Sequence, residues 1–321
     1  MRLVVTIPAF NEEENIEEVI REIPREIHGV SDVKILVLDD GSTDRTVEKA
    51  KNAGADYVIS HKQNKGLAAT FQDAVSAALE RGADIIVNTD GDNHYNQARI
   101  PDLINPIVEQ RADIVIGDRE VRKLKYMPAI NKYLNLFGSY CVSRLVGLKN
   151  TVDVSSGFRA YTREAAMRIS ILSKHTYTHE TLIQAVDHNL IIASVVIKAR
   201  KVTRKSRLIT SIPGHLLRSI LVILRVFTVY KPLRVLSFLG MVVFLPGILL
   251  ILRFLYFYFF TARGGEGHIQ SLIIAAILIL LGFQIFVLGL VASAIGWNRK
   301  TLEEILYRSK KETYRYKSQN K

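Results

Sequence analysis

This sequence of 321 residues is poor in several features that define a class of protein by themselves. It has one cysteine, Cys141, which excludes an internal disulfide framework and indicates a reducing compartment or a chain with no use for cysteine. Its first apolar run, residues 3–7, is too short for a secretory signal, and acidic residues follow it directly. The chain contains no internal repeat and no low-complexity tract.

Acidic residues are missing from the most basic part of the chain. Residues 198–234 contain ten Lys and Arg and no Asp or Glu, and residues 297–321 carry a net charge of +5. Because these segments together exceed the formal net charge of +12, the rest of the chain is slightly acidic. The basic charge therefore belongs to two short segments and not to a DNA-binding domain, so we expect no nucleic-acid partner.

Over residues 1 to about 200, short β-branched apolar runs alternate with amphipathic stretches of helical periodicity. This alternation predicts an α/β fold with a doubly wound sheet, in which ligands bind at the carboxyl ends of the strands. The predicted strands are residues 3–7, 33–38, 57–60, 85–88, 114–117, 157–161 and 191–197. The predicted helices are residues 13–23, 43–53, 67–81, 100–110, 131–145, 163–171 and 180–189.

The sequence Asp90-Gly91-Asp92 directly follows one of these predicted strands. Residues two apart in an extended chain point to the same side, so the two carboxylates can converge on one point. Such a pair can hold Mg²⁺ or Mn²⁺ together with the phosphates of a substrate, and His94 could add a nitrogen ligand. A solvated surface turn is the alternative interpretation of this motif alone.

Two further polar clusters follow predicted strands, and a third polar turn opens a predicted helix. Residues 8–12 are an ordinary helix start if taken alone, and residues 39–44 are a capped turn in which Asp39 or Asp40 could bind a ribose or a base. Residues 64–66 open the next helix, where Lys65 and free N–H groups suit an anion, although a plain turn has the same composition. The coincidence of polar clusters at strand ends favours a ligand site.

The C-terminal part predicts a membrane anchor. Residues 211–232 have the pattern of an amphipathic helix on a membrane surface, with a core helix as the alternative, and residues 235–260 and 271–295 are long enough to span a bilayer. The basic segments on either side of this hairpin predict that both termini are cytoplasmic. We therefore expect a catalytic domain (1–208), a juxtamembrane segment (209–234), two transmembrane helices (235–296) and a basic cytoplasmic tail (297–321).

Several motifs together resemble glycosyltransferase family 2, whose members have the GT-A fold, a Rossmann-like sheet. They are Pro8-Ala9-Phe10-Asn11-Glu12, Asp39-Asp40-Gly41-Ser42-Thr43-Asp44, Asn64-Lys65-Gly66, Asp90-Gly91-Asp92 and Ser156-Gly157-Phe158-Arg159-Ala160-Tyr161. Within the family, Gly117-Asp118-Arg119, the segment 153–161 and Lys205-Ser206-Arg207-Leu208 before the apolar helices resemble the polyprenyl-phosphate branch, which includes dolichol-phosphate mannose synthases. The Gln-x-x-Arg-Trp signature of processive synthases is missing, since the one tryptophan, Trp297, follows the second span.

The resemblance implies a role for individual residues. The nucleotide would contact Pro8, Phe10, Glu12, Val37, Asp39, Lys65, Asp90 and Gly91. Asp90 and Asp92 would hold the metal, with His94 where relatives often have Gln; Arg119, Lys201 and Arg207 would face the phosphates of donor and acceptor, and Asp90, Asp92, Arg119 and Arg207 would be catalytic. Arg204 departs from the glycine usual in relatives, and Lys201 stands where relatives often carry Arg.

The predicted activity is therefore a metal-dependent, inverting hexosyl transfer from a UDP- or GDP-sugar to a dolichyl or undecaprenyl phosphate. The enzyme would be an integral protein of a prokaryotic plasma membrane, and two spans are few to enclose a lipid, which favours a homo-oligomer. One alternative is transfer to a lipid hydroxyl such as a diacylglycerol, with Glu180 or Asp153 as the base. Another is a non-catalytic nucleotide-binding subunit. His175 and His179 are not expected to bind metal, and the aromatic residues 256–260 indicate an interfacial belt.

Overall fold

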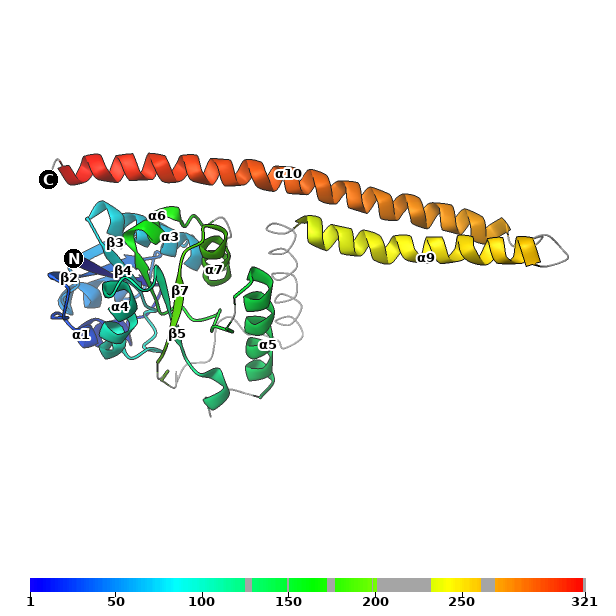
Figure 1. The fold of residues 1–321 in the computed structure, drawn as a ribbon. Coiled ribbons are helices and arrows are strands. Elements are labelled where there is room, and N and C mark those ends of the chain that lie inside the picture. Colours follow the sequence, from blue (N-terminus) through cyan, green and yellow to red (C-terminus); the bar gives the residue numbers. More distant parts are fainter. Residues whose placement is uncertain are drawn as a thin grey trace. The chain divides into compact units, whose positions relative to one another are not determined.

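A computed structural model describes residues 1–124, 129–148, 150–171, 177–197, 199–200, 232–260 and 269–319 (Figure 1). The chain falls into two compact units. The first comprises residues 1–216 together with 303–321, and the second comprises residues 217–302. The first unit contains the predicted sheet, and the second contains the two long apolar helices.

The first unit is built on one sheet of seven strands in the order β3-β2-β1-β4-β6-β5-β7. The strands are β1 (Arg2–Ala9), β2 (Asp32–Asp39), β3 (Tyr57–Ser60), β4 (Ile85–Asn88), β5 (Ile114–Asp118), β6 (Arg159–Thr162) and β7 (Ile192–Val196). All seven predicted strands are confirmed within a few residues. Strand β6 runs antiparallel to both of its neighbours, so the sheet is mixed, a feature that the alternation of strands and helices did not predict.

Helices cover both faces of this sheet. They are α1 (Ile16–Glu22), α2 (Thr46–Asn52), α3 (Leu67–Glu80), α4 (Ile100–Val108), α5 (Ala129–Val146), α6 (Arg163–Arg168) and α7 (Thr178–Asp187), with short 3₁₀ turns η1 (Gln97–Arg99) and η2 (Val121–Lys123). Alternate residues of β1 (Leu3, Val5 and Ile7) pack in one apolar cluster with residues of α1 and α4. Because side chains alternate along a strand, Val4 and Thr6 face the opposite side, and helix α3 packs against β1 and β2.

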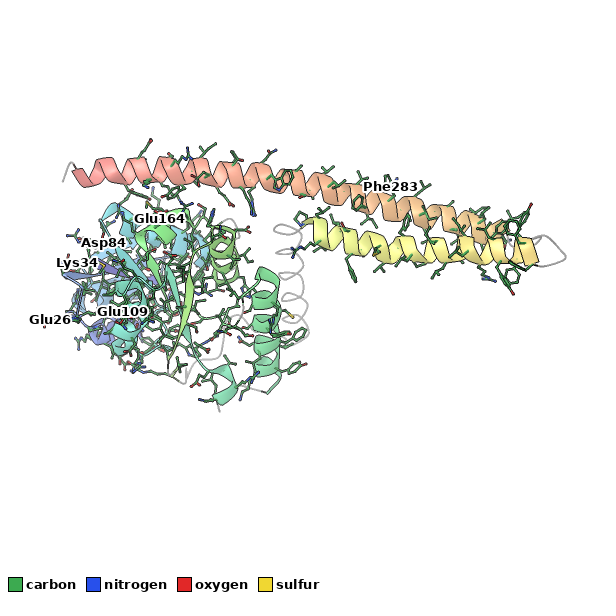
Figure 2. All side chains as sticks on the ribbon, in the orientation of Figure 1. Glu26, Lys34, Asp84, Glu109, Glu164 and Phe283 are labelled. Carbon is green, nitrogen blue, oxygen red and sulfur yellow. The ribbon has the colours of Figure 1, made fainter. Side chains whose placement is uncertain are left out.

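The second unit contains α9 (Pro232–Phe260) and the first part of α10 (Ile269–Gln319). Both helices are long and apolar enough to cross a membrane, with mean hydropathy of 2.7 and 2.8. Their backbones approach closely, since a Cβ at Gly240 would lie 2.8 Å from the carbonyl oxygen of Gly282. Their other faces are exposed, as at Phe283 (Figure 2). Exposed apolar faces on helices of this length suit lipid better than water.

Two predicted segments differ in how far the structure tests them. The basic tail is helical, because α10 continues as one helix to residue 319. Residues 303–321 belong to the first unit. The predicted amphipathic helix lies outside the described residues, apart from residues 232–234 at the start of α9. The predicted domain boundaries therefore stay a prediction.

Candidate active site

The tips of β1, β2 and β4 meet at one edge of the sheet. The amide of Asp40 donates to the carbonyl of Ala9 (2.8 Å), which joins the ends of β1 and β2. At Gly91, just beyond β4, a Cβ would lie 3.5 Å from both the carbonyl oxygen of Pro8 and Cγ of Glu12. The sequence prediction that the polar clusters converge is thus met in the structure.

Asp90 lies in a tight recess behind this edge. A Cβ at Gly157 would lie 2.8 Å from Oδ2 of Asp90 and 2.8 Å from the hydroxyl of Tyr177, so only a glycine leaves room for the carboxylate. Asn88 donates to the carbonyl of Gly157 (3.0 Å) and to the Tyr177 hydroxyl (2.9 Å), and the amide of Gly157 donates to the Tyr95 hydroxyl (2.9 Å). A network of neutral groups therefore fixes the walls around Asp90.

The electrostatics of Asp90 favour a bound cation. Burial and the nearby negative charge of Asp92 raise the pKa of Asp90 to about 7, although Arg119 acts in the opposite direction. A divalent cation between the two carboxylates would remove this cost, and carboxylate oxygens are the ligands that Mg²⁺ and Mn²⁺ prefer. The donor set and its charge fit the predicted metal.

His94 is close to these carboxylates, but its role as a third ligand stays a prediction. Its amide donates to Oδ1 of Asp92 (3.1 Å), with Asn93 between them in a left-handed conformation (φ 57°). Its ring atom Nδ1 is buried without a hydrogen-bond partner, and burial and the charge of Arg119 lower the pKa of His94. Among the described residues, no three His, Cys, Asp or Glu side chains are grouped to hold a metal. Asp90 and Asp92 would supply two ligands to a cation, and Mg²⁺ sites commonly add water and substrate phosphate oxygens to one or two carboxylates.

The wall formed by residues 8–12 and 39–46 is held by hydrogen bonds between the two turns. The amide of Asn11 donates to Oγ of Ser42 (2.8 Å), and the amide of Glu12 donates to Oγ1 of Thr46 (2.8 Å). Asp39 is buried at the tip of β2 and accepts from the amide of Ser42 (3.1 Å). Val37 is fully buried in the apolar core, so its predicted contact with a nucleotide stays untested.

A buried histidine that the sequence prediction missed supports the turn at residues 64–66. In His61, Nδ1 lies 2.8 Å from Asp40 and Nε2 lies 3.0 Å from Asp73. Asp40 also accepts from the amides of Lys65 (2.8 Å) and Gly66 (2.9 Å), and Nζ of Lys65 lies 3.2 Å from Asp73. The only signal in the sequence was the polar turn itself, since His61 and Asp73 belong to no motif.

Arg119, just beyond β5, forms an ion pair with Asp153. Its guanidinium donates to both carboxylate oxygens of Asp153 (2.7 and 2.9 Å) and to Oγ of Ser155 (2.5 Å), which also accepts from Asn135 (2.6 Å). Burial acts to raise the pKa of Asp153, but the Arg119 guanidinium outweighs it and lowers that pKa. Asp153 thus orients Arg119 and is a poor general base.

Arg159 is fully buried and ties the loop at residues 154–158 to α7. Its guanidinium donates to the carbonyls of Val154, Ser156 and Thr178 at 2.7–2.8 Å, and to the hydroxyl of Thr181 at 2.6 Å. This places Tyr177, at the start of α7, beside the recess of Asp90, and Glu180 is buried in the first turn of the same helix. His179 lies there too, and burial and the charge of Arg159 lower its pKa to about 4.

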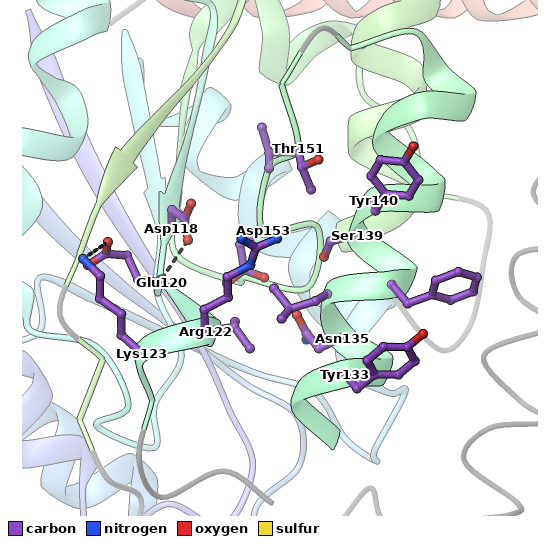
Figure 3. A pocket seen from close by; sticks show the side chains of 14 residues that line it. Asp118, Glu120, Arg122, Lys123, Tyr133, Asn135, Ser139, Tyr140, Thr151 and Asp153 are labelled. Carbon is purple, nitrogen blue, oxygen red and sulfur yellow. Dashed lines mark hydrogen bonds and ion pairs between the residues drawn. The ribbon is translucent and has the colours of Figure 1, made fainter. Parts of the chain in front are cut away.

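Next to Asp153 lies a cavity of about 560 Å³ (Figure 3). One wall is aromatic and apolar and comes from α5, where Tyr133, Leu136, Phe137 and Tyr140 line it. Charged residues from the end of β5 and from η2 line the opposite part, namely Asp118, Glu120, Arg122 and Lys123. The lining thus combines an apolar, aromatic wall with both acidic and basic groups, and Nζ of Lys123 lies 2.6 Å from Oε1 of Glu120.

The remaining predicted phosphate ligands cannot be placed. Lys201 and Arg207 lie outside the described residues, as does His175. The chain is held at Arg200, just before Lys201. The Arg200 guanidinium donates to Oδ1 of Asn93 (2.8 Å), in the loop that follows Asp92, and to the carboxylate of Glu22 (3.0 Å). The amide of Arg200 also donates to the carbonyl of His94 (2.8 Å).

Comparison with known proteins gives a consistent result. The chain is 30% identical over 217 residues to the UDP-N-acetylglucosamine–dolichyl-phosphate N-acetylglucosaminyltransferase of Methanococcus voltae, covering 61% of this chain and 84% of that protein. It is 30% identical over 206 residues to the dolichyl-phosphate hexose transferase of Haloferax volcanii, covering 64% and 86% of the two chains.

The fold also matches solved structures. One is glucosyl-3-phosphoglycerate synthase from Mycobacterium tuberculosis in complex with Mn²⁺, uridine diphosphate and glucosyl-3-phosphoglycerate, with a TM-score of 0.53 and 25% identity, covering 70% of this chain and 78% of that one. The family model described as "Glycosyl transferase family 2" matches residues 4–170, which is more than half of the chain. This protein therefore belongs to glycosyl transferase family 2.

Proposed function

We propose that this protein transfers a sugar, with inversion, from a nucleoside-diphosphate sugar to the phosphate of a polyprenyl phosphate at a membrane surface. The observation that carries the proposal is the carboxylate pair Asp90 and Asp92 at the tip of β4, in a chain with two helices long enough to span a bilayer. The names of the relatives from Methanococcus voltae and Haloferax volcanii support a polyprenyl-type phosphate as acceptor.

The donor would lie along the tips of β1, β2 and β4. Asp39 and Glu12, both buried, would accept hydrogen bonds from the nucleoside, and Phe10 and Pro8 would contact its base. Asp90 and Asp92 would hold a divalent cation, Mg²⁺ or Mn²⁺, which supplies positive charge for the departing nucleoside diphosphate. Lys65, half-exposed at the start of α3, adds a positive charge at the same edge of the sheet.

The acceptor would approach from the side of Arg119. The cavity beside Asp153 offers an aromatic wall for the first isoprene units and Arg122 for a phosphate, and Lys201 and Arg207 are proposed to reach the same phosphate. A phosphate monoester is already anionic at neutral pH, so it needs orientation by fixed positive charges more than a general base. The Asp153–Arg119 pair fits this requirement.

The same pair argues against Asp153 as the base for a lipid hydroxyl acceptor, which leaves Glu180 as the candidate base for that alternative. A hydroxyl nucleophile requires a base near the acceptor, and Asp153 is engaged by both nitrogens of the Arg119 fork that lowers its pKa. The positive-inside pattern supports a cytoplasmic catalytic unit in a prokaryotic plasma membrane, and a homo-oligomer remains part of the proposal.

The decisive experiment uses membranes that contain the full-length protein, radiolabelled nucleotide sugars, Mn²⁺ and a short polyprenyl phosphate. We expect Asp92→Ala to abolish formation of a labelled lipid, while Asp102→Ala, an exposed carboxylate on α4, leaves it unchanged. Mild acid should release the sugar from a phosphodiester-linked product but leave an ordinary glycoside intact. A labelled lipid made by Asp92→Ala would refute the role of the carboxylate pair, and an acid-stable product would refute the phosphate acceptor.

A further inference from the structure

One face of the C-terminal helix is covered by the catalytic unit. Glu303, Tyr307, Lys310 and Tyr314 recur at spacings of four and three residues, which places them on one side of α10. Tyr307 and Tyr314 are buried, whereas Ile305 and Leu306, which lie between Glu303 and Tyr307 in the sequence, are exposed. A basic tail free in solvent would have no such buried stripe.

Tyr307 is the centre of the contact with α6. Its hydroxyl donates to Oε2 of Glu164 (2.8 Å; Glu164 is labelled in Figure 2), and the guanidinium of Arg168 lies 4.0 Å from the centre of its ring. Arg168 also donates to Glu164 (2.8 Å) and to Glu304 (3.4 Å). The phenol, the guanidinium and two carboxylates thus form one network across two elements that are far apart in sequence.

Lys310 binds the end of α6. Its ammonium donates to the carbonyls of Met167 (3.4 Å) and Ile169 (3.2 Å) and to Oγ of Ser170 (3.0 Å). Carbonyl groups at the end of a helix lack intrahelical partners, and a cation is favourable there. Lys310 is partly buried, and this burial lowers the pKa of its ammonium. The neighbouring Lys311 is exposed.

The residues that contact α10 are also linked to α7. Ser170 and Gln184 exchange two hydrogen bonds, from the amide of Ser170 (2.8 Å) and from Nε2 of Gln184 (2.6 Å). At the other end of α7, Nε2 of His188 lies 3.7 Å from the carboxylate of Glu303. Helix α7 begins beside Tyr177 and accepts from the buried Arg159, and Tyr177 forms one wall of the Asp90 recess.

We infer that residues 303–314 of α10 are a support for the active site: they hold α6 against α7 and so fix Tyr177 beside Asp90. In this assignment Lys310 and Tyr307 are positioning residues, since they act through Ser170, Gln184 and α7. The sequence match to the family model ends at residue 170, so this support lies outside the matched region.

The test compares amide hydrogen exchange in full-length proteins reconstituted in lipid nanodiscs. Lys310→Met keeps most of the apolar stem and removes the ammonium, and Glu312→Gln, which removes an exposed charge from the same helix, is the control. Tyr307→Phe removes only the hydroxyl bonded to Glu164, and Lys310→Arg restores a cation. Exchange is followed in peptides from α7 (178–187) and, as an internal reference, from β1 and β2.

We expect Lys310→Met to speed exchange in α7 about tenfold and Tyr307→Phe severalfold, with β1 and β2 unchanged. Glu312→Gln should match the wild type, and Lys310→Arg should restore most of the protection, which general destabilisation of the fold would not predict. Unchanged exchange in α7 for both Lys310→Met and Tyr307→Phe would overturn the inference. Equal acceleration in α7 and in the reference strands would also overturn it, because the effect would then be global.

A second measurement rests on the proposed function. In the sugar-transfer assay, kcat of Lys310→Met should fall severalfold while KM for the nucleotide sugar stays within about twofold. If the wild type shows no transfer, the proposed reaction is refuted. The hydrogen-exchange result still tests whether residues 303–314 stabilise α7. If the wild type is active and kcat of Lys310→Met is unchanged, the link from α7 to the active site is refuted.

Discussion

Gly157 and Asp90 share a space that holds no additional atom: a Cβ at position 157 would lie 2.8 Å from Oδ2 of the aspartate. We therefore predict that Gly157→Ala displaces the carboxylate and lowers sugar transfer by about 100-fold, with a loss of stability of only about 1–3 kcal/mol. Gly138→Ala in α5 is the matched control, since a Cβ there meets nothing within 4 Å. Initial rates and thermal unfolding of both variants check the prediction. Full activity in Gly157→Ala would show that the Asp90 carboxylate does not need the space beside position 157.

The carboxylate pair should destabilise the protein when no cation is bound. Because Asp90 and Asp92 repel each other, we expect Asp90→Asn to raise the free energy of unfolding by about 1–2 kcal/mol in the presence of a chelator. Adding Mn²⁺ should raise the melting temperature of the wild type and leave that of Asp90→Asn nearly unchanged. Asp102→Asn, on the exposed side of α4, should behave as the wild type in both conditions. A metal-free Asp90→Asn protein that is less stable than the wild type would disprove the repulsion.

Asp40 should make the stability of the fold depend on pH. Burial acts to raise the pKa of Asp40, but hydrogen bonds from His61 and from the amides of Lys65 and Gly66 outweigh it and lower that pKa. A carboxyl whose pKa is lower in the folded state stabilises the fold above its unfolded pKa, near 4, and this contribution is lost as the pH falls through the lower, folded value. We predict that Asp40→Asn is less stable than the wild type at pH 7 and that the difference shrinks as the pH falls below about 4.

Urea unfolding at a series of pH values measures this difference. Asp102→Asn serves as the control because Asp102 is an exposed carboxylate on α4. A difference between Asp40→Asn and the wild type that stays constant from pH 7 down to pH 3 would show that the hydrogen bonds of Asp40 do not depend on its charge.

Arg159 should be among the most important residues for stability. Its removal leaves three buried carbonyl groups and the Thr181 hydroxyl without their donor. We expect Arg159→Met to cost about 3–5 kcal/mol of unfolding free energy. Arg163→Met, which removes a single hydrogen bond to Ala83, should cost about 1 kcal/mol or less. Denaturant unfolding distinguishes the two, and equal losses would contradict the organising role of Arg159.

The elements of this fold follow from local patterns. The apolar β-branched runs at residues 3–7 and 85–88 lie in β1 and β4, because a strand buried on both faces must be apolar at every position. The polar residues that follow such runs, including Asp39 after residues 33–38 and Asp90 after residues 85–88, lie at the carboxyl ends of parallel strands. Apolar stretches longer than 20 residues likewise predicted α9 and the first part of α10.

Pairing partners could not be predicted in the same way. The direction of β6 has no signature in its own residues, because apolar periodicity is the same whether a strand is parallel or antiparallel to its neighbours. The pairs His61 with Asp40 and Arg119 with Asp153 join residues 21 and 34 positions apart, and only the folded chain brings them together. His94 beside Asp92 was visible in the sequence, but whether it completes a ligand set depends on the fold.

The sequence by itself determined the type and order of the elements, the edge of the sheet that carries the carboxylates and the length and apolar character of the C-terminal helices, because these depend on composition and spacing along the chain. The tertiary structure alone decided that Gly157 leaves room for Asp90, that Asp153 engages Arg119, and that the basic tail packs against α6 through Tyr307 and Lys310. Each of these contacts joins residues that are remote in sequence, and the spacing of residues along the chain does not give the distance between them in the folded protein.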